Sequence, residues 1–152
     1  MARRSRVKRV GKPKVRSKKT KYNGIEFKSQ LEVDMYQALE SIGVKPKYEP
    51  EHFTVSDGFV YNGEFYKNTK GRKDVHLGQK LVRPITYTPD FVDHDLRFII
   101  ETKGQPNESF PLRWKLFMKY MKDNGMEDYS LFIPRNKYQV NQTASIIKSK
   151  LR

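Results

Sequence analysis

Residues 85–104 read ITYTPDFVDHDLRFIIETKG, and the expected architecture can be built outward from this segment. Two runs rich in β-branched and aromatic residues, 85–92 and 96–103, are typical of strands, and the polar tripeptide Asp93-His94-Asp95 between them is typical of a turn. We expect the two strands to pair as an antiparallel hairpin. Pro89 indicates an edge, a bulge or a bend in the first strand, because proline has no N–H to donate to a ladder.

A helix is expected before this hairpin. Residues 29–42 carry apolar side chains at spacings of three and four, which is the pattern of one buried helical stripe. Ser29 and Glu32 match a capping box at its start, and Gly43 follows its end.

A second helix, a strand and a third helix are expected after the hairpin. Residues 109–124 predict a helix with Ser109 as its N-cap and Pro111 in its first turn. Residues 129–133 predict a short strand, and residues 138–151 predict a closing helix. The second hairpin strand, the helix and the short strand form a βαβ unit with parallel strands. The chain should therefore be a small mixed α/β sandwich with a mixed sheet.

A β-hairpin insertion is expected between the first helix and this core, at about residues 56–80. Asn62-Gly63 separates the runs 59–61 and 64–66, and this dipeptide is a strong signal for a two-residue hairpin turn. Residues 68–79 are polar and contain glycine, which predicts a loop.

The positive charge is concentrated at the N-terminus. The chain has 31 Lys and Arg against 17 Asp and Glu, a formal net charge of +14, and residues 1–21 contain 11 of the basic residues and no acidic one. The sequence predicts a disordered polybasic arm over 1–21 and a folded domain over 22–152. The arm can bind nucleic acid, bind anionic lipid or only aid solubility. We favour nucleic acid, because the arm lacks the Trp, Phe and Leu of a membrane-binding helix. Its expected DNA-binding residues are Arg3, Arg4, Arg6, Lys8, Arg9, Lys18 and Lys19.

Composition excludes several classes of protein. No apolar run approaches the about 20 residues of a membrane span, and no apolar segment of a signal peptide follows the basic start. The chain has no cysteine, which removes disulfides, thiolate zinc sites and cysteine nucleophiles and fits a reducing compartment. His52, His76 and His94 do not show metal-ligand spacing.

Asp90, Glu101 and Lys103 carry the chemical signal. Side chains alternate along a strand, so Glu101 and Lys103 share one face, and the turn brings Asp90 opposite the end of the second strand. Two carboxylates there can bind one or two Mg²⁺ or Mn²⁺ ions, which polarise a phosphodiester and lower the pKa of a bound water. The lysine would stabilise charge on the transition state. Glu32 on the first helix is the expected fourth member, and the backbone carbonyl of Thr102 is a further candidate ligand.

Each of these residues also has an ordinary structural explanation. Asp90 can be a turn residue after proline, Glu101 and Lys103 can be an exposed ion pair of little value, and Glu32 can serve only the capping box. Their placement across one predicted hairpin, in a strongly basic chain, favours the site.

The helix over residues 109–124 carries further basic residues. Arg113, Lys115, Lys119 and Lys122 form an expected basic face that contacts either solvent or DNA phosphates, and we include the first three among the DNA-binding residues. Trp114 is expected in the core rather than stacked on a base.

The segments YTPDF at 87–91 and ETKG at 101–104 together resemble the PD-(D/E)xK nuclease superfamily. FKSQLE at 27–32 resembles the corresponding segment of the phage endonuclease I family, which resolves Holliday junctions. The chain is also similar to small phage proteins of the domain-of-unknown-function 1064 family. The likeness covers roughly residues 21–133, and the insertion at 56–80 departs from the compact resolvase pattern.

This resemblance implies a restriction-endonuclease-like mixed sheet flanked by helices, with an αβββαβ core. It implies Glu32, Asp90 and Glu101 as metal ligands, Lys103 as the catalytic lysine, and Mg²⁺ or Mn²⁺ as the cofactor. It further implies a structure-specific endonuclease for branched DNA in phage recombination or replication, acting in the cytoplasm of the bacterial host, with no membrane or small-molecule partner.

Resolution of a junction needs two symmetric cuts, so we expect a homodimer. Two alternatives stay open: a non-catalytic nucleic-acid-binding protein, and a nicking or restriction-type nuclease on linear duplex.

Overall fold

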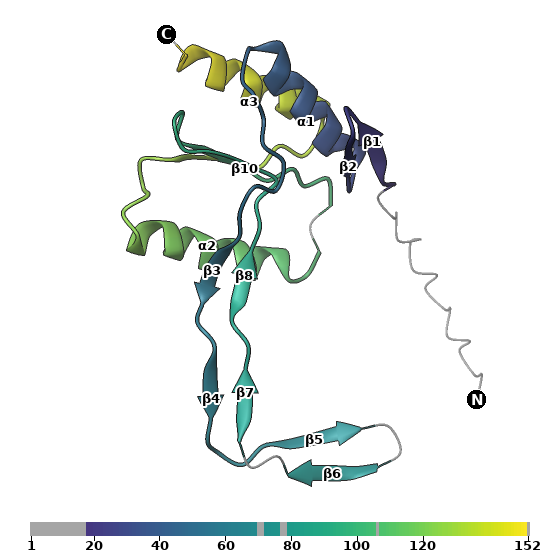
Figure 1. Ribbon diagram of the computed structural model, residues 1–152, viewed down its shortest axis with the longest axis vertical. Helices are drawn as coiled ribbons and strands as arrows, with labels where there is room; N and C mark the ends of the chain where they lie inside the picture. The colour runs from purple at the N-terminus through teal and green to yellow at the C-terminus, as the bar shows by residue number, and fades with distance from the viewer. Residues whose placement is uncertain (1–17, 70–71, 77–78, 106, 152) are drawn as a thin grey trace, which may run out of the picture.

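The computed structural model describes residues 18–69, 72–76, 79–105 and 107–151. Within them the protein is a mixed α/β structure of small sheets and three helices (Figure 1). The central sheet has the order β11-β10-β9, from β9 (Phe91–Asp93), β10 (Phe98–Ile100) and β11 (Ser130–Phe132). β9 and β10 are antiparallel and β10 and β11 are parallel, which confirms the predicted hairpin and βαβ unit.

Helices cover both faces of this sheet. α1 (Gln30–Ser41) and α3 (Lys137–Ser149) lie together on one side, and α2 (Phe110–Asp123) lies on the other (Figure 1). The alternation of side chains along β10 serves both layers, since Phe98 and Ile100 enter the core with α1 and α3 while Ile99 enters the core with α2. All three are buried, so β10 is the centre of the fold.

The helix ends follow local chemistry, with one correction. The Ser29 hydroxyl accepts a hydrogen bond from the Glu32 N–H, so the predicted cap of α1 is confirmed. Ser109 makes no side-chain cap on α2, and the prediction was wrong there. The side chain of Asn107 takes this role, because its Oδ1 accepts from the Phe110 N–H at 2.9 Å.

An N-terminal hairpin precedes α1. β1 (Thr20–Tyr22) pairs with β2 (Ile25–Phe27) around Asn23-Gly24, whose φ angles are 48° and 77°. Both residues thus have the positive φ that a tight hairpin turn of this kind requires. β1 begins inside the segment that was assigned to the basic arm, and residues 1–17 lie outside the described part of the chain.

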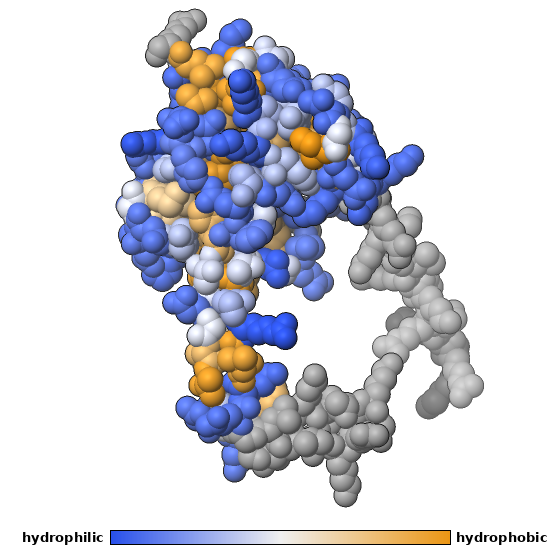
Figure 2. Space-filling view, viewed as in Figure 1, coloured by the Kyte–Doolittle hydropathy of each residue, from blue (hydrophilic) through white to orange (hydrophobic). Residues whose placement is uncertain are grey.

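A long two-stranded ribbon, here called the β-extension (residues 53–87), projects from the body (Figure 1). Three antiparallel pairs build it. They are β3 (Phe53–Ser56) with β8 (Ile85–Tyr87), β4 (Phe59–Tyr61) with β7 (Lys80–Val82), and β5 (Tyr66–Thr69) with β6 (Arg72–His76). Figure 2 shows apolar side chains on its middle part, where Phe59, Val60 and Leu81 are exposed.

The β-extension corrects two predictions. Asn62-Gly63 does not close a hairpin between 59–61 and 64–66, because β4 pairs with β7 instead, and neither residue has a positive φ. The predicted loop at 68–79 contains β6. The reason is tertiary: β4 and β7 continue the ribbon that β3 and β8 begin, and this non-local pairing overrides the local turn preference.

The core strands are shorter than predicted. The segment 88–90 separates β8 from β9, as the proline indicated. β10 ends at Ile100, yet the N–H groups of Glu101 and Lys103 still donate to the carbonyls of Phe132 and Pro134, each at 3.0 Å. The extended backbone therefore continues through the ETK segment and keeps the alternation of its side chains. Among the described residues, the helices are too short and polar for any to cross a membrane.

Candidate active site

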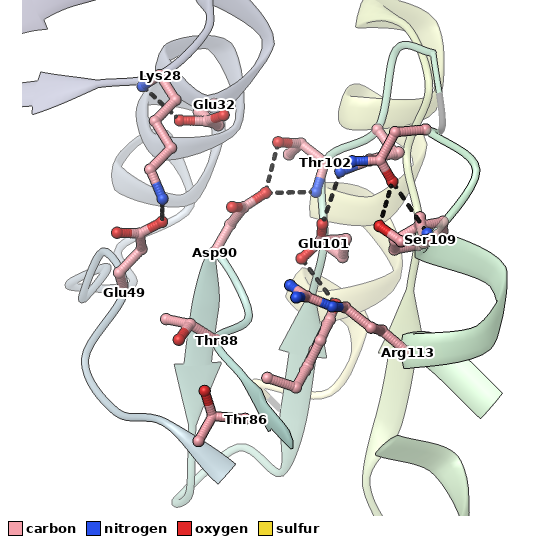
Figure 3. Close-up of a pocket in the computed structure, with 14 residues that line it drawn as sticks. Lys28, Glu32, Glu49, Thr86, Thr88, Asp90, Glu101, Thr102, Ser109 and Arg113 are labelled. Carbon is pink, nitrogen blue, oxygen red and sulfur yellow. Dashed lines mark hydrogen bonds and ion pairs between the residues drawn. The ribbon is translucent and has the colours of Figure 1, made fainter. Parts of the chain in front are cut away.

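A polar cavity of about 440 Å³ opens where β9 begins and β10 ends. Its walls come from α1, from the N-terminal half of α2, from β8 and from the segment before β3 (Figure 3). Glu32, Asp90, Glu101, Thr102 and Lys103 all line it, so the structure brings every predicted catalytic residue to one pocket.

Asp90 is held by the residue between the predicted catalytic pair. Its Oδ2 accepts hydrogen bonds from the Thr102 backbone N–H at 2.6 Å and from the Thr102 hydroxyl at 2.7 Å (Figure 3). Burial, and then the negative charge of Glu101, raise the pKa of Asp90 to about 8, against the opposing effect of the Thr102 hydrogen bonds. The sequence predicted a role only for the Thr102 carbonyl, and not for the backbone N–H and the hydroxyl that donate to Asp90.

Glu101 lies on the α2 side of the same pocket. Tyr87 donates its hydroxyl to Glu101 Oε2 at 2.7 Å, and Lys103 Nζ lies 3.5 Å from Glu101 Oε1. Burial raises the pKa of Glu101, and the hydrogen bond from Tyr87 and the charge of Lys103 act in the opposite direction. The pairing of Glu101 with Lys103 agrees with the expectation that the two share one strand face.

Lys103 is also positioned by α2. Its ammonium lies 4.8 Å from the centre of the Phe110 ring, within cation–π range. Since its side chain is only 24% exposed, the lysine is held at the pocket and does not extend into solvent.

Glu32 lines the pocket from α1, and its oxygens have protein partners. Oε2 accepts from the Lys28 backbone N–H at 2.8 Å and from the Tyr48 hydroxyl at 2.6 Å, while Oε1 accepts from the Ser29 hydroxyl at 2.9 Å. Glu32 thus accepts from the Lys28 N–H and from the Ser29 hydroxyl, and not from the Ser29 backbone N–H that a capping box would use, while it also lines the pocket. Burial, and then the bond to Glu32, raise the pKa of Tyr48.

A fourth carboxylate, Glu49, faces the pocket beside Lys28. The two side chains form an ion pair, and the Glu49 backbone N–H donates to the Asp90 carbonyl at 2.8 Å. Glu49 has φ 44°, a left-handed conformation that is uncommon for a residue other than glycine and is enriched at functional sites. The sequence did not predict Glu49 or Lys28 as part of the site.

Arg113 is the basic residue of α2 that lines the pocket, and its side chain reaches toward Glu101 (Figure 3). The predicted single basic face is wrong. At about 100° per residue, Lys115, Lys119 and Lys122 follow one stripe, and Arg113 points to a different side of the helix. Lys115 is exposed, and Lys119 pairs with Asp123 at 2.8 Å.

The remaining predicted DNA-binding residues lie away from the pocket or outside the described residues. Arg3, Arg4, Arg6, Lys8 and Arg9 belong to residues 1–17. Lys18 is exposed, and Lys19 pairs with Glu26 across the first hairpin at 2.7 Å.

The other singled-out residues have structural roles. Trp114 is partly buried and packs against the core beside Tyr87 and Phe117, in line with the expectation. His94 lies in the turn before β10, where its ring bonds Tyr129 and Glu51 at 2.7 and 2.6 Å. The described backbone of His76 belongs to β6.

In the part of the chain that the structure describes, no set of three or more His, Asp or Glu side chains is arranged so that it could hold a metal ion. Asp90 and Glu101 are the two pocket carboxylates that interact most strongly, while Glu32 is held by its own hydrogen bonds. The oxygen donors at the pocket are carboxylate, hydroxyl and carbonyl groups, which suit Mg²⁺ or Mn²⁺.

The sequence did not predict four residues of the site. Tyr48 and Glu49 reach it only through the fold, whereas Lys28 and Tyr87 lie within four residues of Glu32 and Asp90. For Tyr87 a weak signal existed, since it stands directly before the Thr88-Pro89-Asp90 segment at the end of a strand.

Comparison with curated proteins and with solved structures gave no match. One protein family, described as "Protein of unknown function (DUF1064)", matches residues 12–127, which include every residue of the pocket described above. The chain therefore belongs to the DUF1064 family.

Proposed function

We propose that the protein is a metal-dependent DNA endonuclease with the chemistry of the PD-(D/E)xK superfamily. One observation carries the proposal: Asp90, Glu101 and Lys103 meet in one polar cavity at the ends of two paired strands. Two buried carboxylates and a lysine in a cleft form a combination typical of functional sites, where burial and neighbouring charges shift pKa values.

The donor set fits a divalent metal ion. Asp90 and Glu101 are buried close enough to raise the pKa of Asp90, and a cation bound by both would offset this repulsion. We assign the ion to these two carboxylates with the Thr102 carbonyl. Glu32 is a third candidate ligand, and its two oxygens already accept three hydrogen bonds. When bound, Mg²⁺ or Mn²⁺ supplies Lewis acidity and lowers the pKa of a bound water.

The chain's own residues have distinct roles in the hydrolysis, in which water oxygen joins phosphorus as one P–O bond breaks. Lys103 places its ammonium beside Glu101, where it can orient the attacking water or stabilise developing negative charge. Thr102 fixes Asp90 through two hydrogen bonds, and Tyr87 fixes Glu101 through one.

The architecture supports the same proposal. The order α1, β9, β10, α2, β11 matches an αβββαβ core except for its first strand, because β8 pairs with β3 outside the central sheet. The carboxylates lie at β9 and β10, and helices cover both faces of the sheet. We therefore include a restriction-endonuclease-like core in the proposal.

The net charge of +14 supports DNA as the substrate, since basic side chains neutralise phosphates. We propose branched DNA as the preferred form, cut by a homodimer in phage recombination or replication within the host cytoplasm. Light scattering at micromolar concentration tests the dimer, and a monomer there would count against junction resolution specifically.

A cleavage assay with Mg²⁺ tests the activity on a four-way junction and on linear duplex. We expect wild-type protein to cut, and Glu101→Gln and Lys103→Met each to lose at least about 100-fold in rate, because both act at the reacting phosphate. Lys148→Met, at an exposed position of α3 that belongs neither to the pocket nor to the predicted DNA-binding residues, is the matched control and should retain full activity.

The other outcomes separate the alternatives. Equal cleavage by wild type and both site variants would refute the site. Tight, salt-dependent binding without cleavage would identify a non-catalytic nucleic-acid-binding protein. Equal rates on duplex and junction would identify a nicking or restriction-type nuclease.

A further inference from the structure

The pocket has a cation on each side of its carboxylates. Arg113 enters from α2, and Lys28 enters from the opposite wall, with Asp90 between them (Figure 3). The side chain of Lys28 is 64% exposed, so its ammonium is accessible to a large ligand at the mouth of the pocket.

Lys28 differs from an ordinary surface lysine in what holds it. Its backbone N–H bonds Glu32, which fixes the main chain at the start of α1, and its ammonium bonds Glu49. Glu49 is in turn fixed by its backbone bond to Asp90 and is only 25% exposed. An anionic group is thus held on Lys28 by a backbone that adopts an uncommon left-handed conformation.

We propose that Lys28 binds a phosphate of the substrate strand next to the cleavage site, and that Glu49 occupies the lysine until that phosphate arrives. The inference rests on the proposed function in taking DNA as the polyanion. A strand that crosses the carboxylates from α2 toward α1 would meet Arg113 on one side and Lys28 on the other. Phosphate and carboxylate compete for the same ammonium, so DNA binding must displace Glu49.

The two residues therefore have opposite expected effects on DNA affinity. Lys28→Met removes a phosphate contact, which should weaken binding roughly three- to tenfold and reduce the slope of log K against log salt by about 0.9. Glu49→Gln frees the lysine and should tighten binding by a similar factor. In the Lys28→Met background, Glu49→Gln should give only the small gain of a general charge change.

The experiment measures fluorescence anisotropy of a short labelled duplex with full-length protein in EDTA over a range of KCl concentrations. Lys47→Met and Glu51→Gln are the matched controls, because they make the same charge changes at residues that do not line the pocket. Equal effects of Lys28→Met and Lys47→Met would overturn the proposal. The proposal would also be overturned if Glu49→Gln raised the affinity no more than Glu51→Gln does. The same holds if the full gain from Glu49→Gln remained in the Lys28→Met background.

If Lys28→Met does not fold, the comparison of Glu49→Gln with Glu51→Gln decides alone. Binding in EDTA is independent of cleavage. If Mg²⁺-dependent cleavage is intact but the affinity gain of Glu49→Gln does not depend on Lys28, only this inference is refuted. If the gain depends on Lys28 but no cleavage occurs, only the proposed nuclease activity is refuted.

Discussion

Asp90 is a buried carboxylate whose ionised form the metal-free fold disfavours. Its ordinary pKa is 3.8, and burial together with Glu101 raises the pKa to about 8 in the folded protein. Below about pH 4 the group is protonated in both the folded and the unfolded state. Between pH 4 and 8 the unfolded chain releases this proton more readily, so the contribution of Asp90 to stability is lost as pH rises through this range.

Asp90→Asn should therefore stabilise the metal-free protein at pH 8 and have little effect at pH 4. We expect a gain of at least about 1 kcal/mol in unfolding free energy at pH 8, or about 2–4 °C in the melting midpoint. Thermal unfolding in EDTA measures it, with the exposed Asp57→Asn as the control. Added Mg²⁺ should reduce the difference in unfolding free energy between Asp90→Asn and the wild type, because Mg²⁺ stabilises only the wild type. A less stable Asp90→Asn at pH 8 would show that the Thr102 hydrogen bonds outweigh burial.

At the level of elements, two Asn-Gly dipeptides behave differently. Gly24 has φ 77° in the β1–β2 turn, so an alanine there is strained even though its Cβ would meet nothing within 4 Å. Gly63 has no positive φ, and an added Cβ would lie 2.5 Å from the hydroxyl of Tyr61. Since Tyr61 is 46% exposed, its ring can move away from that contact.

Gly24→Ala should accordingly cost about 1 kcal/mol of unfolding free energy, and Gly63→Ala should cost less. The cost of the first change should appear in global unfolding, because Phe27 of β2 is fully buried in the core with α1. Urea denaturation of both variants gives the comparison. A larger loss for Gly63→Ala would mean that the ring of Tyr61 is held in place at the turn.

At the scale of the whole molecule, many of the basic residues lie in a different part of the chain from the pocket and the two cores. Residues 1–17 hold eight of the basic residues and no acidic one, while the pocket and both cores lie in the described part of the chain. Removing 1–17 should leave the melting midpoint unchanged and weaken DNA binding strongly. The salt slope should fall by several units, up to about 7 if every basic residue contacts a phosphate.

Anisotropy titrations over a salt series measure this change, and the cleavage rate at saturating DNA should stay close to that of the full chain. A shortened protein that melts several degrees lower would show that these residues contribute to the fold. Unchanged affinity would assign DNA binding to the folded domain alone.

Local patterns were sufficient where the interactions are local. The apolar stripe and the Ser29 cap of α1 required only neighbouring residues. The run Phe98-Ile99-Ile100 predicted a strand, and the structure buries all three side chains. The turn before β10 is short, so strand alternation was enough to bring Asp90, Glu101 and Lys103 together. Each of these interactions spans few residues, and few alternative arrangements compete with it.

Contacts between distant segments depended on the tertiary structure. Tyr48 and Glu49 reach Glu32, Asp90 and Lys28 only after the chain returns from α1, and nothing in their immediate sequence indicates it. The pairing of β4 with β7 overrode a strong turn signal, because a ribbon already begun by β3 and β8 adds further backbone hydrogen bonds. Patterning along the chain was thus enough to bring Asp90, Glu101 and Lys103 together, whereas Tyr48 and Glu49 were placed beside them by packing between segments far apart in sequence.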